Sequence, residues 1–510
     1  MADLIPTISE KCQGAMLASA IGDALGWPNE RRQNKIQNNS PTGEMFPAWT
    51  RTIRFPHWHQ EQILPGEYSD DTQLTLAVAR SILTENWEFQ FAMHELPYWL
   101  SYERGGGKAI KNAAKACRDK TVLWKQKNVQ EYFDAGGNGV TMRILPHVVS
   151  RAHDTDVNGL MIEVIQDGII THGHPRALVG ALCFAYALNY LLNKEDVLKF
   201  GELVSVIIDA RETWGILPED NALEEWRNVA ITQSGYDYMT VWYQTVDQMI
   251  DRLHYIKNSL EKGILTDDNK ALRDLECFSK ANGAGDVATL AAIYLTSKYA
   301  NNPILGVKIP ALAKGMDTDT VASMTGALLG MLCGTSWIPN EWKMVQDYTC
   351  IVKITELLLA NQKLESTKAY IKQEMQDDKS WSKTPMGMAR LVESYSIQSK
   401  NADVIIRKIM SALGQTIYVK EYHEKEKGSA KEKMAAPSDG EVLDFDGKLS
   451  FSVNQAEISE LLKCQSLGRK TFSKILQIVD ALMLQESPEN IAKKLNVDLE
   501  SVKTISRYIA

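Results

Sequence analysis

Two short stretches of the sequence place carboxylates next to hydroxyls. Ser-Asp-Asp-Thr occupies residues 69–72, and Met-Asp-Thr-Asp-Thr occupies residues 316–320. The polar side chains of both stretches are oxygen donors, and neither stretch contains His or Cys. Oxygen-only ligand sets are those that Mg²⁺ and Mn²⁺ prefer. If the two stretches converge in the fold, they supply enough oxygen atoms for two ions, whose charge would offset the repulsion among the acids.

Both acidic motifs stand directly before an apolar run of helical periodicity. The first leads into QLTLAVARSIL and the second into VASMTGALLGMLCG. A carboxylate or hydroxyl at that position can simply cap a helix, with the helix dipole favouring the acid. A cap uses one side chain, however, and the two motifs contain four acids together. Capping therefore stays open for either motif alone, whereas the pair favours a metal centre.

Two glycine clusters, RGGGK at 104–108 and AGGNG at 135–139, lie between predicted helices. Glycine lets backbone N–H groups approach a pyrophosphate without an intervening side chain. Each cluster is also compatible with a plain flexible connection. Two histidines earlier in the sequence, His57 and His59, flank Trp58 and are interpreted as surface-loop residues rather than ligands.

Composition indicates an ordinary globular chain. Of the 510 residues, 44% are hydrophobic, and 56 basic against 64 acidic residues give a net charge of −8, which argues against a surface devoted to nucleic acid. The seven cysteines are dispersed without a CxxC pair, and the first residues lack a basic and an apolar signal region. We therefore expect a cytoplasmic protein with reduced thiols and no membrane segment. The uncharged run at 321–339 is interpreted as a buried helix.

The elements that must position the motifs are helices. Apolar runs rich in Ala, Leu and Met recur through the chain and strand signals are scarce, which predicts an all-α protein. Residues 34–69 carry little periodicity and are expected to form an irregular segment covering the site. The predicted domains are a catalytic domain at 1–362, a helical extension at 363–422, a polar flexible linker at 423–441 and a small C-terminal module at 442–510, which starts with a short hairpin.

The C-terminal module has the rhythm of a helix-turn-helix, with PENIAKKL as the first short helix and LESVKTISRYI as the second. Residues 455–510 contain eight basic and seven acidic side chains. A net charge of +1 is a weak basis for phosphate contacts. The module is therefore expected to bind a protein partner or to serve a structural role, with DNA as the alternative.

Five segments, in this order, resemble the ADP-ribosylglycohydrolase family, whose type member activates dinitrogenase reductase by removing ADP-ribose. They are GAMLASAIGDALGWPNE at 14–30, SDDT at 69–72, GNGVTMRILPHVV at 137–149, ITHGHPRALVGALCFAYAL at 170–188 and KGMDTDTVASMTGALLGMLCGTSWIPNEW at 314–342. The resemblance covers roughly residues 10–360. Gly315-Met316 stands where the family often has Gly-Gly, and residues 45–68 have the character of an insertion beside the first acidic motif.

The resemblance implies a compact multi-helix domain that hydrolyses the glycosidic bond between ADP-ribose and a modified target, with two Mg²⁺ or Mn²⁺ ions as cofactors. The metal ligands it implies are Ser69, Asp70, Asp71, Asp317, Asp319 and Thr320. Catalysis is implied for Glu30 together with Asp70 and Asp71. The implied substrate-binding residues are Gly105, Gly106, Gly107, Gly136, Gly137, Asn138, Gly139, Met142, Arg143 and His172.

Other interpretations remain beside this one. The chain could bind ADP-ribose or another nucleotide as a sensor that signals through its C-terminal module, although a sensor does not require a complete set of acids. It could also be a two-metal hydrolase of a nucleotide phosphate, which leaves the Thr-His-x-His-Pro segment unexplained. Within the first interpretation, ADP-ribose on arginine, on serine, on a nucleic-acid base or in an O-acyl ester presents the same half to the enzyme. An ADP-ribosylated protein is the expected partner.

Overall fold

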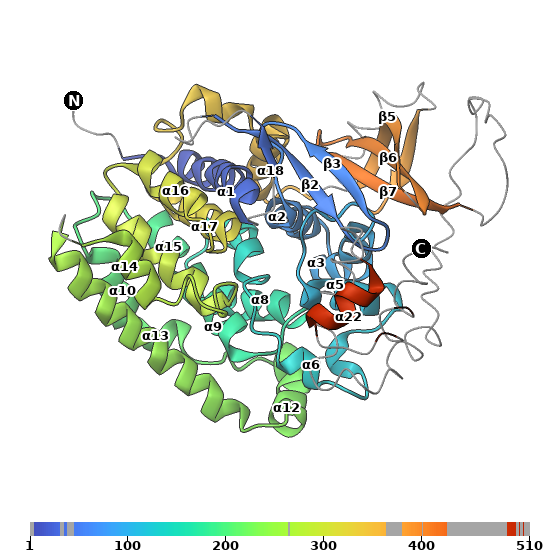
Figure 1. The fold of residues 1–510 in the computed structure, drawn as a ribbon. Helices are drawn as coiled ribbons and strands as arrows, with labels where there is room; N and C mark the ends of the chain where they lie inside the picture. Colours follow the sequence, from blue (N-terminus) through green and yellow to red (C-terminus); the bar gives the residue numbers. More distant parts are fainter. Residues whose placement is uncertain are drawn as a thin grey trace. The chain divides into compact units, whose positions relative to one another are not determined.

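The computed structural model describes residues 5–30, 35–37, 45–263, 266–363, 380–399, 401–425 and 487–495, and the isolated positions 499 and 503. The chain divides into two compact units, residues 1–427 and 428–510. The first unit contains the helical body and two small antiparallel sheets (Figure 1). The predicted helical fold is confirmed, and the two sheets are additions that the sequence analysis did not predict.

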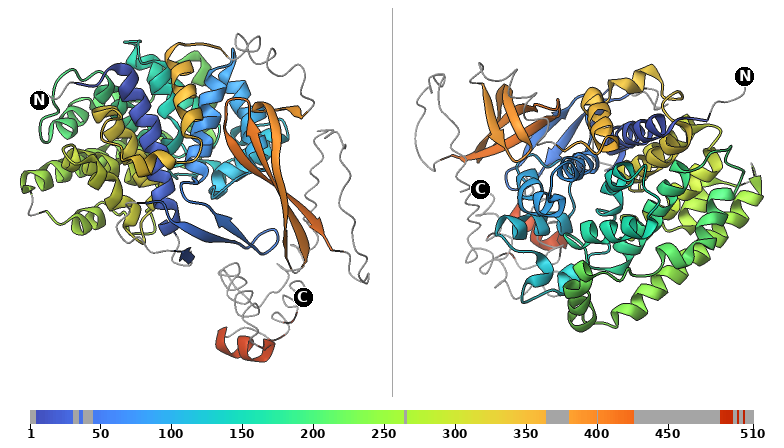
Figure 2. Two further views of the ribbon diagram at one scale, coloured as in Figure 1. Left: turned by 90° about the horizontal axis from the view of Figure 1, so that it is seen from above. Right: turned by 180° about the vertical axis from the view of Figure 1, so that it is seen from behind.

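The centre of the helical body is a pair of antiparallel helices, α1 (Ile8–Glu30) and α17 (Thr318–Cys333), which lie side by side in all views (Figures 1 and 2). Glycines bring their backbones together, since a Cβ on Gly22 would lie 2.2 Å from the Ala322 carbonyl oxygen. A Cβ on Gly26 would lie equally close to the Thr318 carbonyl oxygen. This packing places the C-terminal end of α1, with Glu30, beside the N-terminal end of α17.

Further helices surround this pair. α9 (Pro175–Leu192) and α15 (Gly285–Tyr299) pack on each other and on α17, and α16 (Pro303–Leu312) packs on α1 and α17. The other helical segments are α2 (Asp70–Ile82), α3 (Trp87–Gln90), η1 (Phe91–Glu95), α4 (Leu96–Trp99), α5 (Lys108–Arg118), η2 (Leu123–Lys125), α6 (Gln130–Phe133), η3 (Thr141–Arg143), α7 (Leu145–Ser150), α8 (Val157–Ile169), α10 (Glu202–Asp209), α11 (Arg211–Trp214), η4 (Asn221–Leu223), α12 (Glu224–Gln233), α13 (Tyr238–Glu261), α14 (Asp268–Asp274), η6 (Asn340–Met344) and α18 (Tyr348–Leu359).

One helix among the described residues, α9, is long and apolar enough to cross a membrane, and 78% of it is buried inside the protein. It serves as a core helix, packed on α8, α13, α15 and α17. The apolar run that begins at Val321 forms most of α17 and is also buried, as the sequence analysis predicted.

The segment expected to be irregular contains a three-stranded antiparallel sheet of β1 (Lys35–Gln37), β2 (Ala48–Ile53) and β3 (His59–Ile63). The prediction of an irregular segment is therefore wrong for these strands, and His59 is a buried strand residue rather than a surface-loop one. The alternation of burial along β3 is clear, but its inward face carries His59, Glu61 and Ile63. Because polar residues occupy the buried face, the hydrophobic pattern of a strand is hidden.

The predicted helical extension at 363–422 is wrong over its described part. Residues 381–424 form an antiparallel meander of β4 (Trp381–Thr384), β5 (Gly387–Gln398), β6 (Ala402–Ser411) and β7 (Thr416–Glu424), in that order. Val404 and Ile406 alternate with less buried residues along β6, a period of two. Gly387 and Gly414 have positive φ at two of the turns. The spacing of these glycines and the β-branched residues between them were the available signals of a sheet, and the charged residues masked them.

The boundary expected at 423 falls inside β7, which extends to Glu424. The sheet β4–β7 belongs to the same compact unit as the helical body. In the second unit, α22 (Pro488–Leu495) coincides with the first helix of the predicted helix-turn-helix. The predicted hairpin near residue 446, most of the second helix of the module and most of the predicted linker lie outside the described residues.

Candidate functional site

The first acidic motif forms the N-terminus of α2. The backbone N–H of Asp71 donates to Ser69 Oγ at 3.2 Å, so Ser69 is an N-cap, as one interpretation of the sequence predicted. A second carboxylate supports the same turn. Asp23 of α1 accepts from the N–H groups of Ser69 and Thr72, each at 3.0 Å, and from Thr72 Oγ1 at 2.6 Å. The sequence analysis quoted Asp23 in the first family segment but did not assign it to the site.

The second acidic motif forms the N-terminus of α17 in a different way. Asp317 occupies the N-cap position, yet its side chain makes no capping hydrogen bond. It accepts instead from Asn138 Nδ2 at 2.8 Å. Asp319 accepts from the N–H of Thr320 at 3.0 Å. Helix capping therefore accounts for Ser69 but leaves Asp317 directed toward the loop that contains Asn138.

The two acidic motifs meet, because α2 and α17 contact each other and both pack on α1. Burial raises the pKa of Asp71 well above its usual value, and the nearby carboxylates of Asp23, Asp70 and Asp317 raise it further. The pKa of Asp319 is also raised well above its usual value, first by burial and then by the carboxylates of Glu30, Asp317 and Asp71. We call Asp23, Glu30, Asp70, Asp71, Asp317 and Asp319 the acidic cluster.

Asp70 links this cluster to the loop on its flank. Burial raises the pKa of Asp70 well above its usual value, and the nearby carboxylates of Glu103, Asp23 and Glu30 raise it further. Its backbone N–H donates to the carbonyl oxygen of Arg104 at 3.2 Å. The acidic cluster thus collects side chains from three regions of the sequence and borders a fourth.

A hard divalent cation fits the chemistry of this donor set. Asp71 Oδ1 is buried and has no hydrogen-bond partner, which is costly for a carboxylate oxygen unless a cation meets it. The surrounding groups are carboxylates and the hydroxyls of Ser69 and Thr320, all oxygen ligands. No three His, Cys, Asp or Glu side chains within the described part of the chain converge as a ready-made ligand set for one ion. The fit therefore rests on the unpartnered oxygen and on the uncompensated charge.

The first glycine cluster packs directly against the first acidic motif. Gly105 has φ +132°, and a Cβ there would lie 2.5 Å from Asp70 Oδ1. A Cβ on Gly106 would overlap the Trp99 ring at 2.2 Å. Gly107 has open space around its Cβ position and precedes α5. The lack of side chains is thus required at Gly105 and Gly106 by packing, while Gly107 leaves an uncovered backbone beside the cluster.

The second glycine cluster is anchored to a segment that the sequence analysis missed. The N–H of Asn138 donates to Gly283 O at 2.9 Å, and the N–H of Gly285 donates to Gly136 O at 3.1 Å. A Cβ on Gly283 would lie 3.3 Å from Asp317 Oδ2. The run Asn-Gly-Ala-Gly at 282–285 resembles the other glycine clusters, and that composition was the available signal.

His172 faces this loop from the other side. A Cβ on Gly139 would lie 2.9 Å from His172 Cε1, and one on Gly137 would lie 3.6 Å from Nε2. Burial, and then the charge of Arg143, lowers the pKa of His172 to about 3, so the imidazole is neutral at physiological pH. Its Nδ1 lies 2.7 Å from Thr171 Oγ1. The neighbouring His174 caps α9 by accepting from the N–H of Arg176.

Met142 and Arg143 support the loop from the protein interior. Arg143 is completely buried, lies 2.6 Å from Asp167 and donates to the carbonyl oxygen of Gly139. The Met142 side chain packs in an apolar cluster with Ile110. Their side chains therefore hold the shape of the Gly136–Gly139 loop from behind. The other predicted substrate-binding residues gather around the acidic cluster in the two loops and at His172.

The profile of the ADP-ribosylglycohydrolase family matches residues 5–368. The chain belongs to the ADP-ribosylglycohydrolase family. This confirms the resemblance that the five segments indicated. The family match covers α1, both acidic motifs and both glycine clusters, and it ends before β4. The sheet β4–β7 and the second unit are therefore additions to the part that matches the family.

Several relatives share low but extended similarity with this member of the family. The chain is 22% identical over 347 residues to the ADP-ribosylarginine hydrolase Tri1 of Pseudomonas putida, covering 65% of this chain and 73% of that protein. It is 23% identical over 353 residues to the ADP-ribosylhydrolase ARH3 of Xenopus tropicalis, covering 65% and 89%. It is 24% identical over 199 residues to the ADP-ribosyl-[dinitrogen reductase] glycohydrolase of Rhodospirillum rubrum, covering 37% and 60%.

Proposed function

We propose that this chain hydrolyses the glycosidic bond between ADP-ribose and a side chain of a modified protein, with two Mg²⁺ or Mn²⁺ ions in the acidic cluster. The observation that carries the proposal is the meeting of the two acidic motifs beside the two glycine loops, in a member of this family. Buried acids that raise one another's pKa serve catalysis or metal binding more often than stability.

The ions would be held by the oxygen atoms of the two helix starts, namely Ser69, Asp70, Asp71, Asp317, Asp319 and Thr320. When bound, they would orient the hydroxyls of the distal ribose and lower the pKa of a water molecule. The protein's own task is to keep these side chains in place. Asp23 does so for α2 through its three hydrogen bonds, and Asn138 does so for Asp317.

Glu30 is our candidate for the general base. It is the last residue of α1 and lies close enough to Asp70 and Asp319 to raise the pKa of both, after the effect of burial. A carboxylate there can accept a proton from the attacking water as the oxygen bonds to C1″ of the ribose. The bond from C1″ to the acceptor breaks through an oxocarbenium-like state, and the proton that Glu30 takes from the water passes to the leaving acceptor, so the products are ADP-ribose and the unmodified side chain.

The two glycine loops would bind the rest of ADP-ribose. Gly107 is exposed and Gly136 and Gly137 are partly exposed, and backbone N–H groups at these positions would suit a diphosphate. The N–H groups of Gly105 and Asn138 are already bonded to Glu103 and Gly283 and shape the loops instead. The neutral His172 can hydrogen-bond to a ribose hydroxyl or phosphate oxygen through Nε2. The proposal of a protein target is supported by relatives whose names refer to ADP-ribosylarginine and to dinitrogen reductase.

The test is incubation of the full chain with a panel of ADP-ribosylated substrates, scoring the release of ADP-ribose. The panel contains a protein modified on arginine, a protein modified on serine, a modified nucleic acid and an O-acyl-ADP-ribose. Each is assayed with Mg²⁺, with Mn²⁺ and with EDTA. We expect metal-dependent release from a modified protein. Tight binding of ADP-ribose without release from any substrate would overturn the proposal in favour of a sensor.

A second test compares two variants. Asp317→Ala removes a carboxylate of the acidic cluster, and Asp237→Ala is the matched control. Both acids occupy the N-cap position of a helix, but Asp237 is exposed, belongs to neither acidic motif and caps α13 by accepting from the N–H of Thr240. Asp317→Ala is expected to lower kcat/KM at least about a hundredfold, a loss of roughly 3 kcal/mol of transition-state stabilisation. Asp237→Ala is expected to keep the parental rate and to lose only the stability that its helix cap contributes. Equal activity of the two variants would contradict the proposed site.

A further inference from the structure

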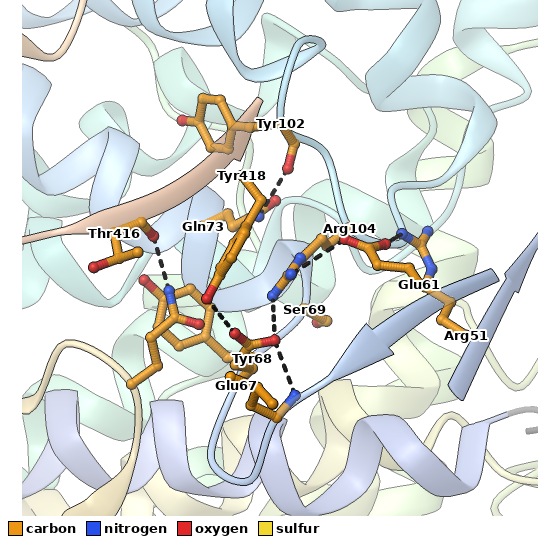
Figure 3. Close-up of polar contacts among 12 residues, drawn as sticks. Arg51, Glu61, Glu67, Tyr68, Ser69, Gln73, Tyr102, Arg104, Thr416 and Tyr418 are labelled. Carbon is orange, nitrogen blue, oxygen red and sulfur yellow. Dashed lines mark hydrogen bonds and ion pairs between the residues drawn. The ribbon is translucent and has the colours of Figure 1, made fainter. Parts of the chain in front are cut away.

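A second cluster of buried charges lies next to the acidic cluster, and its side chains are paired. We call Arg51, Glu61, Glu67, Glu103, Arg104 and Lys420 the ion-pair cluster; Figure 3 shows its centre. The guanidinium of Arg104 lies 3.1 Å from Glu61 and 2.9 Å from Glu67. Lys420 Nζ lies 3.3 Å from Glu61. Glu61 comes from β3, Glu67 lies just before the first acidic motif, and Lys420 comes from β7.

β7 contacts residues 101–104, the segment that leads into the first glycine loop. The backbone N–H of Lys420 donates to Ser101 O at 2.9 Å, and its Nζ donates to Glu103 O at 3.1 Å. The Tyr418 ring lies against the guanidinium of Arg104, with Arg104 Cζ 4.1 Å from the ring centroid. The Tyr418 hydroxyl donates to Glu67 (Figure 3). Lys420 and Tyr418 of β7 therefore hold residues 101–104, Lys420 through its backbone and side chain and Tyr418 through its ring.

The same segment continues into the proposed active site without a break. Glu103 Oε2 accepts from the N–H of Gly105 at 3.0 Å. The carbonyl oxygen of Arg104 accepts from the N–H of Asp70 at 3.2 Å. Gly105 lies against Asp70 Oδ1 so closely that a Cβ would not fit. A displacement of residues 103–104 would consequently move both the glycine loop and the first residue of α2.

Stability alone is a weak reason to bury these charges. Replacing a buried ion pair by apolar side chains is often neutral or stabilising, because desolvation consumes most of the Coulomb energy. The sheet also has other anchors on the helical body. Thr416 N–H donates to Asp347 at 3.0 Å, and Gln346 Nε2 donates to Thr416 O at 2.8 Å. The Lys420 contacts are therefore directed at the loop rather than required for attaching the sheet.

We propose that Lys420 and Tyr418, in a sheet outside the family match, are positioning residues that fix residues 101–107 against Asp70 and so set the affinity of the site for ADP-ribose. The inference rests on the proposed function for its kinetic consequence but not for its structural one. The sheet β4–β7 is then a working part of the site, with Arg104 and Glu103 as the residues through which it acts.

The test compares Lys420→Met with Lys420→Arg and with Lys425→Met. Lys425 lies one residue past the end of β7 and pairs with Asp403 at 3.1 Å, with both side chains exposed, so it receives the same substitution without touching the loop. Hydrogen exchange of residues 70 and 101–107 is the first readout. Loss of the bonds to a charged donor should speed exchange there about tenfold in Lys420→Met, and Lys420→Arg should restore part of the protection.

Kinetics provides the second readout. We expect Lys420→Met to raise KM about tenfold with a smaller change in kcat, the pattern of lost substrate positioning. Lys425→Met should match the parent in both. Equal exchange and equal KM in Lys420→Met and Lys425→Met would overturn the inference. If the parent hydrolyses no substrate, the proposed function fails while the exchange experiment still decides the positioning role. Should Lys420→Met not fold, Tyr418→Phe, which keeps the ring and loses only the hydroxyl, serves for the same measurements.

Discussion

The acidic cluster and the ion-pair cluster bury the same kind of side chain with opposite electrostatic results. Burial alone raises the pKa of Glu103, but Lys111, Arg51 and Lys420 lower it to about 2. The pKa of Glu61 is also held below its usual range, where Lys420 and Arg104 outweigh burial. In the acidic cluster the neighbours of Asp71 and Asp319 are other carboxylates, and they add to the effect of burial.

This difference separates two uses of a buried acid. The ion-pair cluster is complete within the chain, because its cations come from β2, β7 and the segment around Arg104. In the acidic cluster the acids mainly face other acids, so their negative charge exceeds what nearby cations such as Lys111 balance, and a bound cation gains most under that condition. The two meet at Asp70, whose N–H binds Arg104 O and whose pKa is raised by Glu103 after burial.

The largest effect is expected from breaking the complete cluster. Arg104→Met leaves Glu61 and Glu67 without their shared cation, and breaking a buried pair costs about 3–5 kcal/mol of unfolding free energy. Urea denaturation measures the loss. Arg211→Met removes an exposed pair with Asp247 and is the control, with an expected change below about 1 kcal/mol. Similar losses for the two variants would contradict the distinction between a buried network and surface pairs.

Metal binding should stabilise the incomplete cluster. Ions that bind only the folded state add RT ln(1 + [L]/Kd), about 2.7 kcal/mol at a hundredfold excess over Kd. Mg²⁺ or Mn²⁺ should therefore raise Tm after removal of metal with EDTA, more effectively than Zn²⁺. Differential scanning calorimetry of the parent and of Asp317→Ala provides the comparison. A Tm that does not respond to added metal in the parent would count against the site.

The two clusters should respond to acid with opposite sign. Glu103 has a folded pKa of about 2 against 4.5 for the free group, so its contribution is present above pH 4.5 and is lost as the pH falls toward 2. The acids of the metal-free acidic cluster have raised pKa values, so their repulsion is relieved as the pH falls from neutral toward 3.8. Each group changes the unfolding free energy by at most about 1.4 kcal/mol per pH unit. Unfolding of metal-free protein should thus show a stability maximum in mild acid; a monotonic loss of stability from neutral pH downward would contradict this assignment.

A smaller effect, of unusual sign, is expected from Asp71→Asn. Removing one charge from the uncompensated cluster should stabilise the metal-free protein by about 1 kcal/mol, since a raised pKa reports a destabilised carboxylate. The same variant should lose most of the stabilisation by Mg²⁺. Chemical denaturation with and without metal measures both. Destabilisation of the metal-free form would show that Asp71 is already compensated within the chain.

The smallest effect is expected from truncation after Lys427, which removes the second compact unit. Both clusters lie within residues 1–427, so hydrolysis of a small ADP-ribosylated substrate and Tm should stay near the parental values. Truncation after Gln362 removes β4–β7, and with it Lys420 and Tyr418, and should weaken substrate binding. Loss of activity in the longer fragment would move the boundary of the catalytic unit beyond residue 427.

Local features of the sequence were enough to predict the helical body and most of the candidate site. The periodic apolar runs predicted the helices, and the acid-rich helix starts at 69–72 and 317–320 were visible because their residue types exceed what capping needs. Glycine runs marked the loops at 105–107 and 136–139, and the family segment at 137–149 covered most of the second loop. These signals are short-range, since each depends on residues within one turn or one helix.

The tertiary structure decided what depends on burial by distant residues. His59 and Glu61 conceal the pattern of a strand because their polar side chains occupy its inward face, where Arg104 and Lys420 pair with Glu61. The charged residues of β5–β7 masked the alternating pattern of strands, and the sheet that these strands form depends on pairing between residues far apart in the sequence. Asp23 reads as an ordinary helix residue until α2 places the N–H groups of Ser69 and Thr72 against it. A buried charge needs a partner, and only the fold determines which one it receives.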